Sequence, residues 1–106
     1  MQQIERGMSL TFEISGPFRC ENQALIAGDS RHFVLAAVGR GHTYQRILRN
    51  RSGEEVARAL GSILLQARRE DGINVRVMIL DNDAALLHRR VEAICREFNI
   101  RTILRL

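Results

Sequence analysis

The sequence contains no lysine and no tryptophan, and it has only one proline and two cysteines. No apolar run approaches the ~20 residues that a membrane-spanning helix needs, so we expect no membrane association. The first ten residues lack the apolar segment of a signal peptide, which favours an intracellular location, cytoplasmic or nuclear. Cys20 and Cys95 have no Cys-x-x-Cys or Cys/His spacing. Two free thiols are the simplest expectation, although the sequence also permits a disulfide between them.

The absence of lysine makes the charge unusual, because all sixteen basic residues are arginine and the formal net charge is +4. A guanidinium group matches phosphate oxygens better than an ammonium group does, so DNA is a candidate partner. A GC-rich coding sequence explains the same composition without any function. Aromatic residues make up only 5% of the chain, which argues against a base-stacking surface. The candidate phosphate contacts are Arg46, Arg49, Arg51, Arg89 and Arg90.

Three strand patterns come first along the chain. Residues 8–15 alternate apolar and polar side chains, which predicts a half-buried strand that the Gly16-Pro17 pair ends. A loop is expected up to about Ser30. The near-continuous apolar run 31–39 predicts a central strand. The Gly-Arg-Gly between this run and the alternation over 42–49 predicts a tight turn, so the second and third strands form a hairpin.

A helical pattern follows. Ser52 and Glu55 match a capping box, in which Ser52 accepts from the third helical amide and Glu55 reaches back to the cap. Asp71 and Gly72 are expected to end this helix. Its buried face is predicted from the helical spacing of apolar residues, namely Val56, Ala59, Leu60, Ile63, Leu64 and Ala67.

The last third of the chain predicts a strand, a helix and a strand. Residues 74–81 are apolar and β-branched enough for an interior parallel strand. Asn82 or Asp83 is expected to cap the second helix and Asn99 to end it, before a last strand over 100–106. The predicted buried face of this helix holds Leu87, Val91, Ile94 and Phe98, and Cys95 beside it is expected to fill the core.

The expected organisation is therefore a leader over residues 1–7 and one α/β domain over 8–106, with the order β-β-β-α-β-α-β. Two helical crossovers must add parallel strands, which predicts a mixed five-stranded sheet flanked by helices. In the most economical packing, the first strand lies beside the fourth at the sheet centre. Since open α/β sheets place sites at the carboxyl ends of such strands, Glu13 and Asp81 are expected to lie together at one edge.

Three segments carry a resemblance to a known family. FEISGPF (12–18) is similar to a first-strand segment in which an aspartate precedes a Gly-Pro pair. The stretch 31–60 matches a hairpin followed by a helix that opens with Ser and acidic residues. MILDNDAALLHRRVEAICREFNIRTILRL (78–106) is similar to a segment in which Asp-Asn ends a strand. Together they resemble the ribonuclease-H-like catalytic core of retrotransposon and retroviral integrases, with the copia type most similar.

The resemblance implies a two-metal phosphoryl-transfer site with Mg²⁺ or Mn²⁺. It assigns Asp81 to the second catalytic acid, with Asn82 after it, and Glu13 to the position of the first. Glu13 departs from the family's aspartate by one methylene, which moves the carboxylate by more than an angstrom. The family's glycines after Asp-Asn are replaced by Ala84 and Ala85. Its third acid lies on a helix after the last strand, and the sequence ends before one, so activity of this chain alone is not expected.

Each of these acids also has an ordinary structural explanation. A carboxylate such as Asp81 is favourable where a strand ends near a helix N-terminus. Asp83 is better explained as a helix cap than as a ligand, and Glu13 as a solvated or arginine-paired residue. His32, His42 and His88 share no spacing, so zinc is not indicated.

Two functional hypotheses follow. The first is a transposon-derived, non-catalytic domain with no cofactor, which binds a protein partner or a second copy of itself through an exposed sheet edge or helix face. The second is a fragment of a Mg²⁺-dependent nuclease or strand transferase that uses Glu13 and Asp81. A bacterial α/β regulatory domain without transposon ancestry is a weaker third alternative.

Overall fold

A computed structural model describes residues 8–21, 24–27 and 32–105, so the predicted leader over 1–7 lies outside the described residues. Six strands and two helices follow one another in these parts of the chain. They are β1 (Met8–Glu21), β2 (Ala24–Ala27), β3 (His32–Gly39), β4 (His42–Leu48), α1 (Gly53–Asp71), β5 (Val75–Asp81), α2 (Arg89–Glu97) and β6 (Arg101–Arg105).

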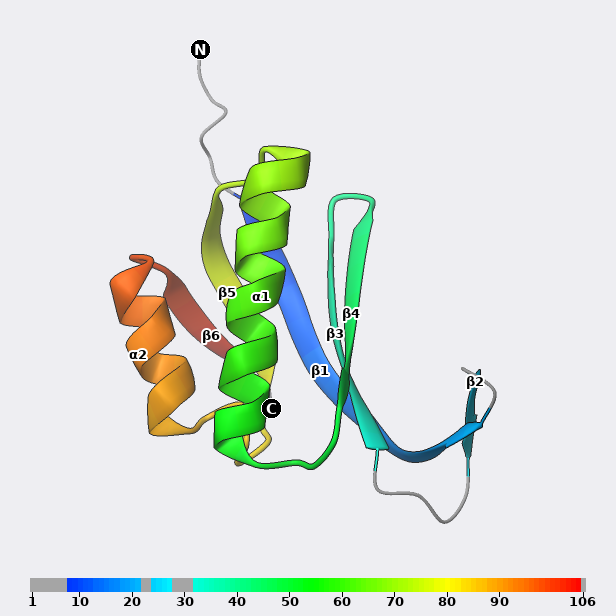
Figure 1. Cartoon of the computed structure of the whole chain (residues 1–106). Coiled ribbons are helices and arrows are strands. Elements are labelled where there is room, and N and C mark those ends of the chain that lie inside the picture. The colour runs from blue at the N-terminus through cyan, green and yellow to red at the C-terminus, as the bar shows by residue number, and fades with distance from the viewer. Residues whose placement is uncertain (1–7, 22–23, 28–31, 106) are drawn as a thin grey trace.

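The sheet has the strand order β4-β3-β1-β5-β6, with β2 paired to β1 outside this path (Figure 1). β1, β3 and β4 form an antiparallel meander. β5 pairs in parallel with β1 on one side and with β6 on the other. The prediction that the first and fourth predicted strands lie side by side at the sheet centre is therefore confirmed, as is the α/β class with a mixed sheet.

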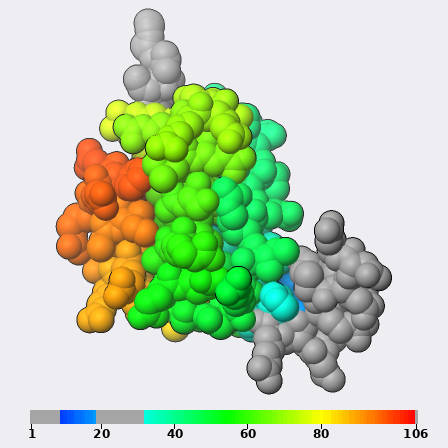
Figure 2. All heavy atoms as spheres, in the orientation of Figure 1, coloured from blue at the N-terminus to red at the C-terminus, as the bar shows by residue number. Residues whose placement is uncertain are grey.

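Both helices lie on the same face of the sheet. α1 contacts β3, β4 and β5, α2 contacts β6, and the two helices contact each other. Figure 2 shows them side by side as one continuous layer. The core lies between this layer and the sheet, and its largest fully buried side chains are Phe12, Leu10, Leu35, Leu48, Leu60, Ile63, Met78, Leu86, Val56 and Val91. All six apolar residues of the stripe predicted for the first helix are buried.

The first strand is longer than predicted, because the Gly16-Pro17 pair does not end it. β1 continues to Glu21, and its pairing with β3 resumes at Phe18 and His32 after a bulge that begins at Ser15. Gly16 adopts φ +129°, which only glycine tolerates readily, and the bulge keeps the proline out of the ladder. The loop predicted up to about Ser30 contains β2, which pairs with the far end of β1.

The predicted hairpin turn is confirmed. Arg40 (φ +47°) and Gly41 (φ +83°) both have the positive φ that a two-residue turn between twisted strands requires. The end of the first helix is confirmed as well, since Gly72 takes the left-handed conformation and its amide donates to Ala67.

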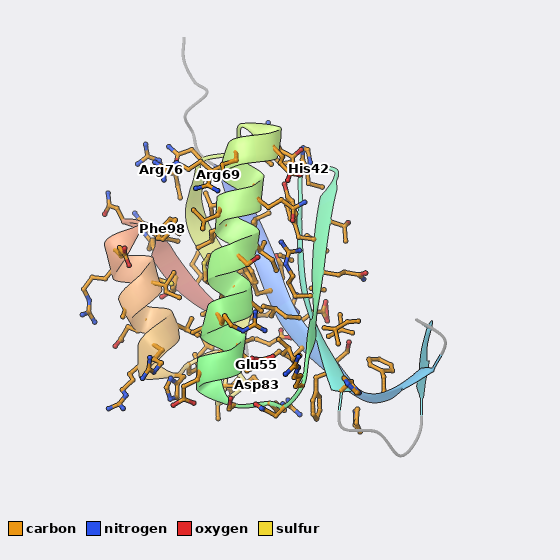
Figure 3. All side chains as sticks on the ribbon, in the orientation of Figure 1. His42, Glu55, Arg69, Arg76, Asp83 and Phe98 are labelled. Carbon is orange, nitrogen blue, oxygen red and sulfur yellow. The ribbon has the colours of Figure 1, made fainter. Side chains whose placement is uncertain are left out.

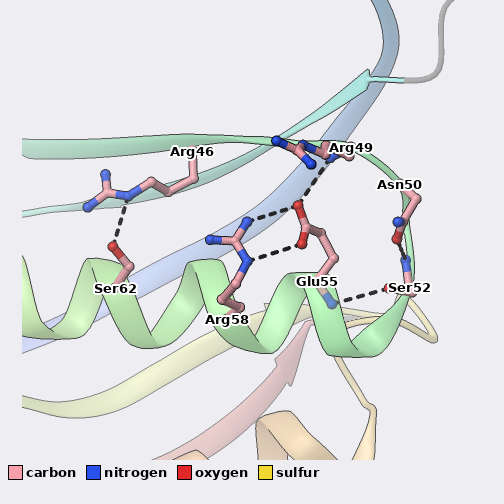
Figure 4. Close-up of polar contacts among 7 residues, drawn as sticks. All are labelled: Arg46, Arg49, Asn50, Ser52, Glu55, Arg58 and Ser62. Carbon is pink, nitrogen blue, oxygen red and sulfur yellow. Dashed lines mark hydrogen bonds and ion pairs between the residues drawn. The ribbon is translucent and has the colours of Figure 1, made fainter.

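The capping box is only half formed (Figure 4). Ser52 Oγ accepts from the Glu55 amide at 3.2 Å, as predicted. The Glu55 carboxylate does not return to the Ser52 amide, which donates instead to Asn50 Oδ1 at 2.9 Å. Glu55 accepts from the Arg49 amide and from Arg58, and these contacts hold the pKa of its carboxyl below the ordinary value. A local Asn-x-Ser turn thus replaces the second half of the box.

The start of the second helix was predicted wrongly. Asp83 caps only an isolated turn, in which its Oδ1 accepts from the Ala85 amide at 2.9 Å. α2 begins at Arg89, because His88 Nδ1 accepts from the Arg90 amide and supplies the true N-cap. Leu87 consequently precedes the helix and is exposed, whereas Val91 and Cys95 are buried. The C-cap is Phe98, one residue earlier than the predicted Asn99, which follows it with φ +56°.

The starts of the two helices touch through Gly53 and His88. The His88 ring lies so close to Gly53 that a Cβ added there would overlap ring Cγ and Cδ2. We therefore expect Gly53→Ala to lower the free energy of unfolding by about 1–3 kcal/mol, as overpacking does. Gly61→Ala in the same helix is the matched control. Its Cβ would lie 3.7 Å from Ile94 Cδ1, an ordinary contact, so helix propensity should raise stability by up to about 1 kcal/mol. Urea denaturation measures both.

A double-mutant cycle with His88→Ala identifies the cause. His88→Ala removes ring Cγ and Cδ2 but keeps Cβ, which lies 2.5 Å from the new methyl, so Gly53→Ala should cost less in the His88→Ala background without becoming neutral. An equal loss of stability in both backgrounds would show that the His88 ring is not the reason why Gly53→Ala is destabilising.

Candidate functional site

Glu13 and Asp81 come from neighbouring strands at the same level of the sheet. The last residue pair of the β1–β5 ladder joins Phe12 to Leu80, and the two carboxylate residues are the next ones on their strands. Phe12 and Leu80 belong to the core under the helices. Side chains alternate along a strand, so Glu13 and Asp81 belong to the opposite face. The structure thus places the two predicted acids next to each other, with Asp81 at the carboxyl end of β5 and Glu13 within β1, which continues to Glu21.

Asp81 is already engaged by a cation from β6. Its Oδ1 accepts from Arg105 Nε at 2.8 Å and from Nη2 at 2.5 Å, and the two residues are direct partners in the β5–β6 ladder. Glu13 is exposed and lies opposite Ala36 of β3. Within the described residues, no three His, Cys, Asp or Glu side chains gather as a metal site would require. The two acids therefore lie on neighbouring strands, and Asp81 pairs with the guanidinium of Arg105.

The five arginines predicted to contact phosphate have different surroundings. Arg46 is half-buried against α1, where Nε donates to Ser62 and Nη2 to Gln66 Oε1 at 2.6 Å (Figure 4). Arg51 pairs with Asp83 and lies 5.6 Å above the Phe33 ring centre. Arg49, the first residue after β4, is exposed. Arg89 and Arg90 lie on α2, where Arg90 Nε is 3.9 Å from Glu54. Two of the three cations before α1 therefore serve internal contacts.

A cluster that sequence reasoning missed joins β4 to the end of α1. Tyr44 donates its hydroxyl hydrogen to Asp71 Oδ2 at 2.5 Å, and His42 Nδ1 lies 3.7 Å from the same oxygen. Figure 3 shows His42 at this end of the hairpin. Burial and the Asp71 carboxylate raise the pKa of Tyr44 to about 12. A buried tyrosine on an alternating strand was the available signal, because such a hydroxyl needs a partner.

Cys95 is a buried free thiol, as its predicted role in the core requires. Its Sγ lies 3.9 Å from Met78 Sδ, and burial raises its pKa, which keeps the thiol protonated and unreactive. The side chain of Cys20 lies outside the described residues.

The sheet face opposite the helices, here called the open face, is a second candidate site. One register row crosses all five strands through residues without charge, namely Thr43, Val38, Thr11, Ile79 and Ile103. Val38, Ile47 and Ile103 of this face are 47%, 50% and 48% exposed. No helix in residues 32–105 covers them, since α1 and α2 pack together on the other side. The open face thus leaves β-branched apolar side chains in contact with solvent.

Charges on the open face are few and balanced. Glu13 and Asp81 carry the negative charges, and Arg101 and Arg105 lie on this face as the ladder partners of Val77 and Asp81. The β3–β4 half of the face, in contrast, carries no charge in its register pairs Val34–Ile47, Ala36–Gln45 and Val38–Thr43. The face as a whole therefore attracts neither a strongly acidic nor a strongly basic partner.

Comparison with protein-family models and with curated proteins finds no match to this chain. Among the described residues, neither helix is long and apolar enough to cross a membrane.

The titration of Tyr44 can be followed by absorbance without overlapping signals, because Tyr44 is the only tyrosine and the chain has no tryptophan. Phenolate absorbance near 295 nm should appear near pH 12 rather than near 10. Since the folded pKa exceeds the unfolded one, the stability that Tyr44 contributes is complete below about pH 10 and is lost between about pH 10 and 12. Urea unfolding across this range measures the loss.

Two variants separate the effect of the tyrosine hydroxyl from the effect of the Asp71 charge. Tyr44→Phe should remove this pH dependence and cost about 1–3 kcal/mol at neutral pH through the lost hydrogen bond. Asp71→Asn should shift the tyrosine transition towards lower pH because the carboxylate charge is gone. A wild-type transition near pH 10 would contradict the Tyr44–Asp71 hydrogen bond.

Proposed function

We propose that this chain is a transposon-derived, ribonuclease-H-like domain of the integrase-core type that no longer cuts nucleic acid and that self-associates through its open face. Three observations support the proposal. Apart from the added β2, the element order is the one on which the resemblance rests, and β1 pairs with β5 as the expected packing requires. Asp81 pairs with Arg105. The uncharged row across the open face, in which Val38 and Ile103 are about half exposed, supports self-association.

The apolar side chains of the open face favour contact with another surface. Parallel strands in folded proteins are generally buried on both faces, because covering helices or sheets remove their apolar side chains from water. β5 is such a strand, with Met78 and Leu80 under the helices and Ile79 on the open face. A protein surface placed on the open face would complete the burial of β5 and its neighbours.

The charge balance favours a second copy as the occupant. Among the described residues in regular ladder register, two acids and two arginines balance each other on this face, although the whole chain carries +4. Two copies can therefore approach face to face without the repulsion that the rest of their surfaces produces. A strongly acidic partner would find no excess positive charge on this face, and a basic partner no excess negative charge.

The size of the open face predicts a weak dimer. Five strands, each about 4.8 Å from the next, and about five residues of ~3.3 Å along each strand give a footprint of roughly 400 Å² per copy. The roughly 800 Å² buried in total is below the ~1,200–2,000 Å² of a standard stable interface. Association should therefore depend on concentration in the range that structural experiments use.

Sedimentation at about 10 μM to 1 mM tests this directly. We expect a monomer that becomes a dimer over this range, and we expect Val38→Lys and Ile47→Lys to keep the protein monomeric. Leu87→Lys is the matched control, because Leu87 is 49% exposed, close to the 50% of Ile47, but lies in the helix layer. A wild-type protein that stays monomeric at 1 mM would overturn self-association. Equal weakening by the Leu87 and Ile47 variants would exclude the open face as the contact.

The adjacency of Glu13 and Asp81 favours one second candidate, a fragment of a Mg²⁺-dependent nuclease or strand transferase. Two carboxylates side by side on neighbouring strands could hold a divalent cation with further acids from elsewhere. The Arg105 guanidinium occupies Asp81 Oδ1 and places a positive charge where the cation would bind. A cation would have to displace it.

Mg²⁺ or Mn²⁺ titration of the backbone amides distinguishes the two candidates. Under our proposal, amides near Glu13 and Asp81 should not respond at millimolar metal in the wild-type protein. Arg105→Gln should strengthen any response, because it removes the competing charge, and Arg96→Gln on α2 is the control for net charge. Saturation of the wild-type protein at low millimolar metal would favour the nuclease candidate.

A further inference from the structure

Three exposed arginines meet at the end of the sheet farthest from Glu13 and Asp81. Arg68 lies in the last turn of α1, Arg76 near the start of β5 and Arg101 at the start of β6. None of the three forms an ion pair within the described residues, unlike Arg51 and Arg105. Figure 3 shows Arg76 near the end of α1, at the level of Arg69. Three separate segments thus bring unneutralised guanidinium groups to one region.

Two adjoining hollows connect these arginines. One, of about 250 Å³, lies between the ends of α1 and α2 and is lined by Arg68, Asn74 and Asn99 among others. The other, of about 410 Å³, is lined by Arg76 and Arg101. Asn99 and Ile100 line both hollows, so the two lie next to each other. In Figure 2 the end of α1 and the α2–β6 connection border the same edge of the molecule.

The polar groups in these hollows suit an anion. Glu97 is the only acidic residue among those that line them, against three arginines. The amides of Asn74 and Asn99 can donate further hydrogen bonds. Arginine offers a planar fork of donors that matches phosphate oxygens. Phe98, half-buried against the core, is the only aromatic residue there, which leaves little surface for base stacking.

We infer that the Arg68–Arg76–Arg101 surface binds the phosphodiester backbone of a nucleic acid. The contact is to phosphates and not to bases, because arginine and amide donors predominate and aromatic side chains are scarce. Binding should therefore be independent of sequence and sensitive to salt. The surface lies at the amino ends of β5 and β6, away from the residues to which the resemblance assigns catalysis, and the inference does not depend on self-association.

Fluorescence anisotropy with a labelled single-stranded 20-mer and a matched duplex tests the inference, with the full chain at about 20–200 mM NaCl. Three phosphate contacts predict a slope of log affinity against log salt of about −2 for the single strand and about −3 for the duplex. Similar affinity for unrelated sequences is expected. No binding at the lowest salt, or binding that salt does not weaken, would overturn the inference.

Charge reversal locates the contact. Arg68→Glu and Arg76→Glu should each weaken binding at low salt by about tenfold or more and make the salt slope shallower by about 1. Arg58→Glu is the matched control, because it makes the same charge change on an arginine of α1 that is 64% exposed and lines neither hollow. Equal weakening by all three variants would mean that only net charge matters and would overturn the assigned surface. Arg101 is left unchanged because it also lies on the open face, where a substitution could alter self-association. The Arg68 and Arg76 variants should therefore sediment like the wild-type protein.

Discussion

The parallel pairing of β1 with β5 is the contact on which the rest of the molecule depends. Leu10 pairs with Met78 and Phe12 with Leu80, and all four side chains are buried under the helices. The pairing joins the antiparallel meander to the β5–α2–β6 unit, which otherwise contacts the first half of the chain mainly through α1. It also sets the register that puts Glu13 beside Asp81 and Thr11 beside Ile79. A slip of one residue would exchange the core face with the open face.

The one-sided helix layer follows from the same topology. β4 runs parallel to β5, because two antiparallel pairings separate it from β1. Both helical connections, β4–α1–β5 and β5–α2–β6, therefore join parallel strands and move in the same direction across the sheet. Right-handed crossovers in one direction place both helices on one face. The open face is thus a consequence of strand order, and its β-branched residues on β3, β5 and β6 are apolar although no helix of this unit can reach them.

Sequence patterns predicted the elements whose periodicity was strong and local. The α1 stripe, the Gly-Arg-Gly turn and the strand over 74–81 all depend on neighbouring residues and were found. The continuation of β1 past Gly16-Pro17 was missed because a bulge tolerates this pair where a regular strand would not. The start of α2 was missed because His88 caps it through ring Nδ1, an acceptor less common than the Asp83 carboxylate five residues earlier. The position of Asp81 was predictable from strand order, whereas its pairing with Arg105 depended on the β6 register.

The amino and carboxyl ends of β5 differ in electrostatic character, because the arginines are paired with acids at one end and not at the other. At the carboxyl end of β5, helix connections and ladder partners bring arginines to the acids, so Asp81 pairs with Arg105 and Asp83 pairs with Arg51. Such pairs stabilise the ladder and the loops modestly, since all are partly exposed. At the amino ends of β5 and β6, no acid reaches Arg76 or Arg101 among the described residues. An arginine without an ion-pair partner in the fold remains available to bind a ligand, whereas an arginine paired with Asp81 or Asp83 does not. The arginines that bind phosphate are therefore best sought where the fold has not used them.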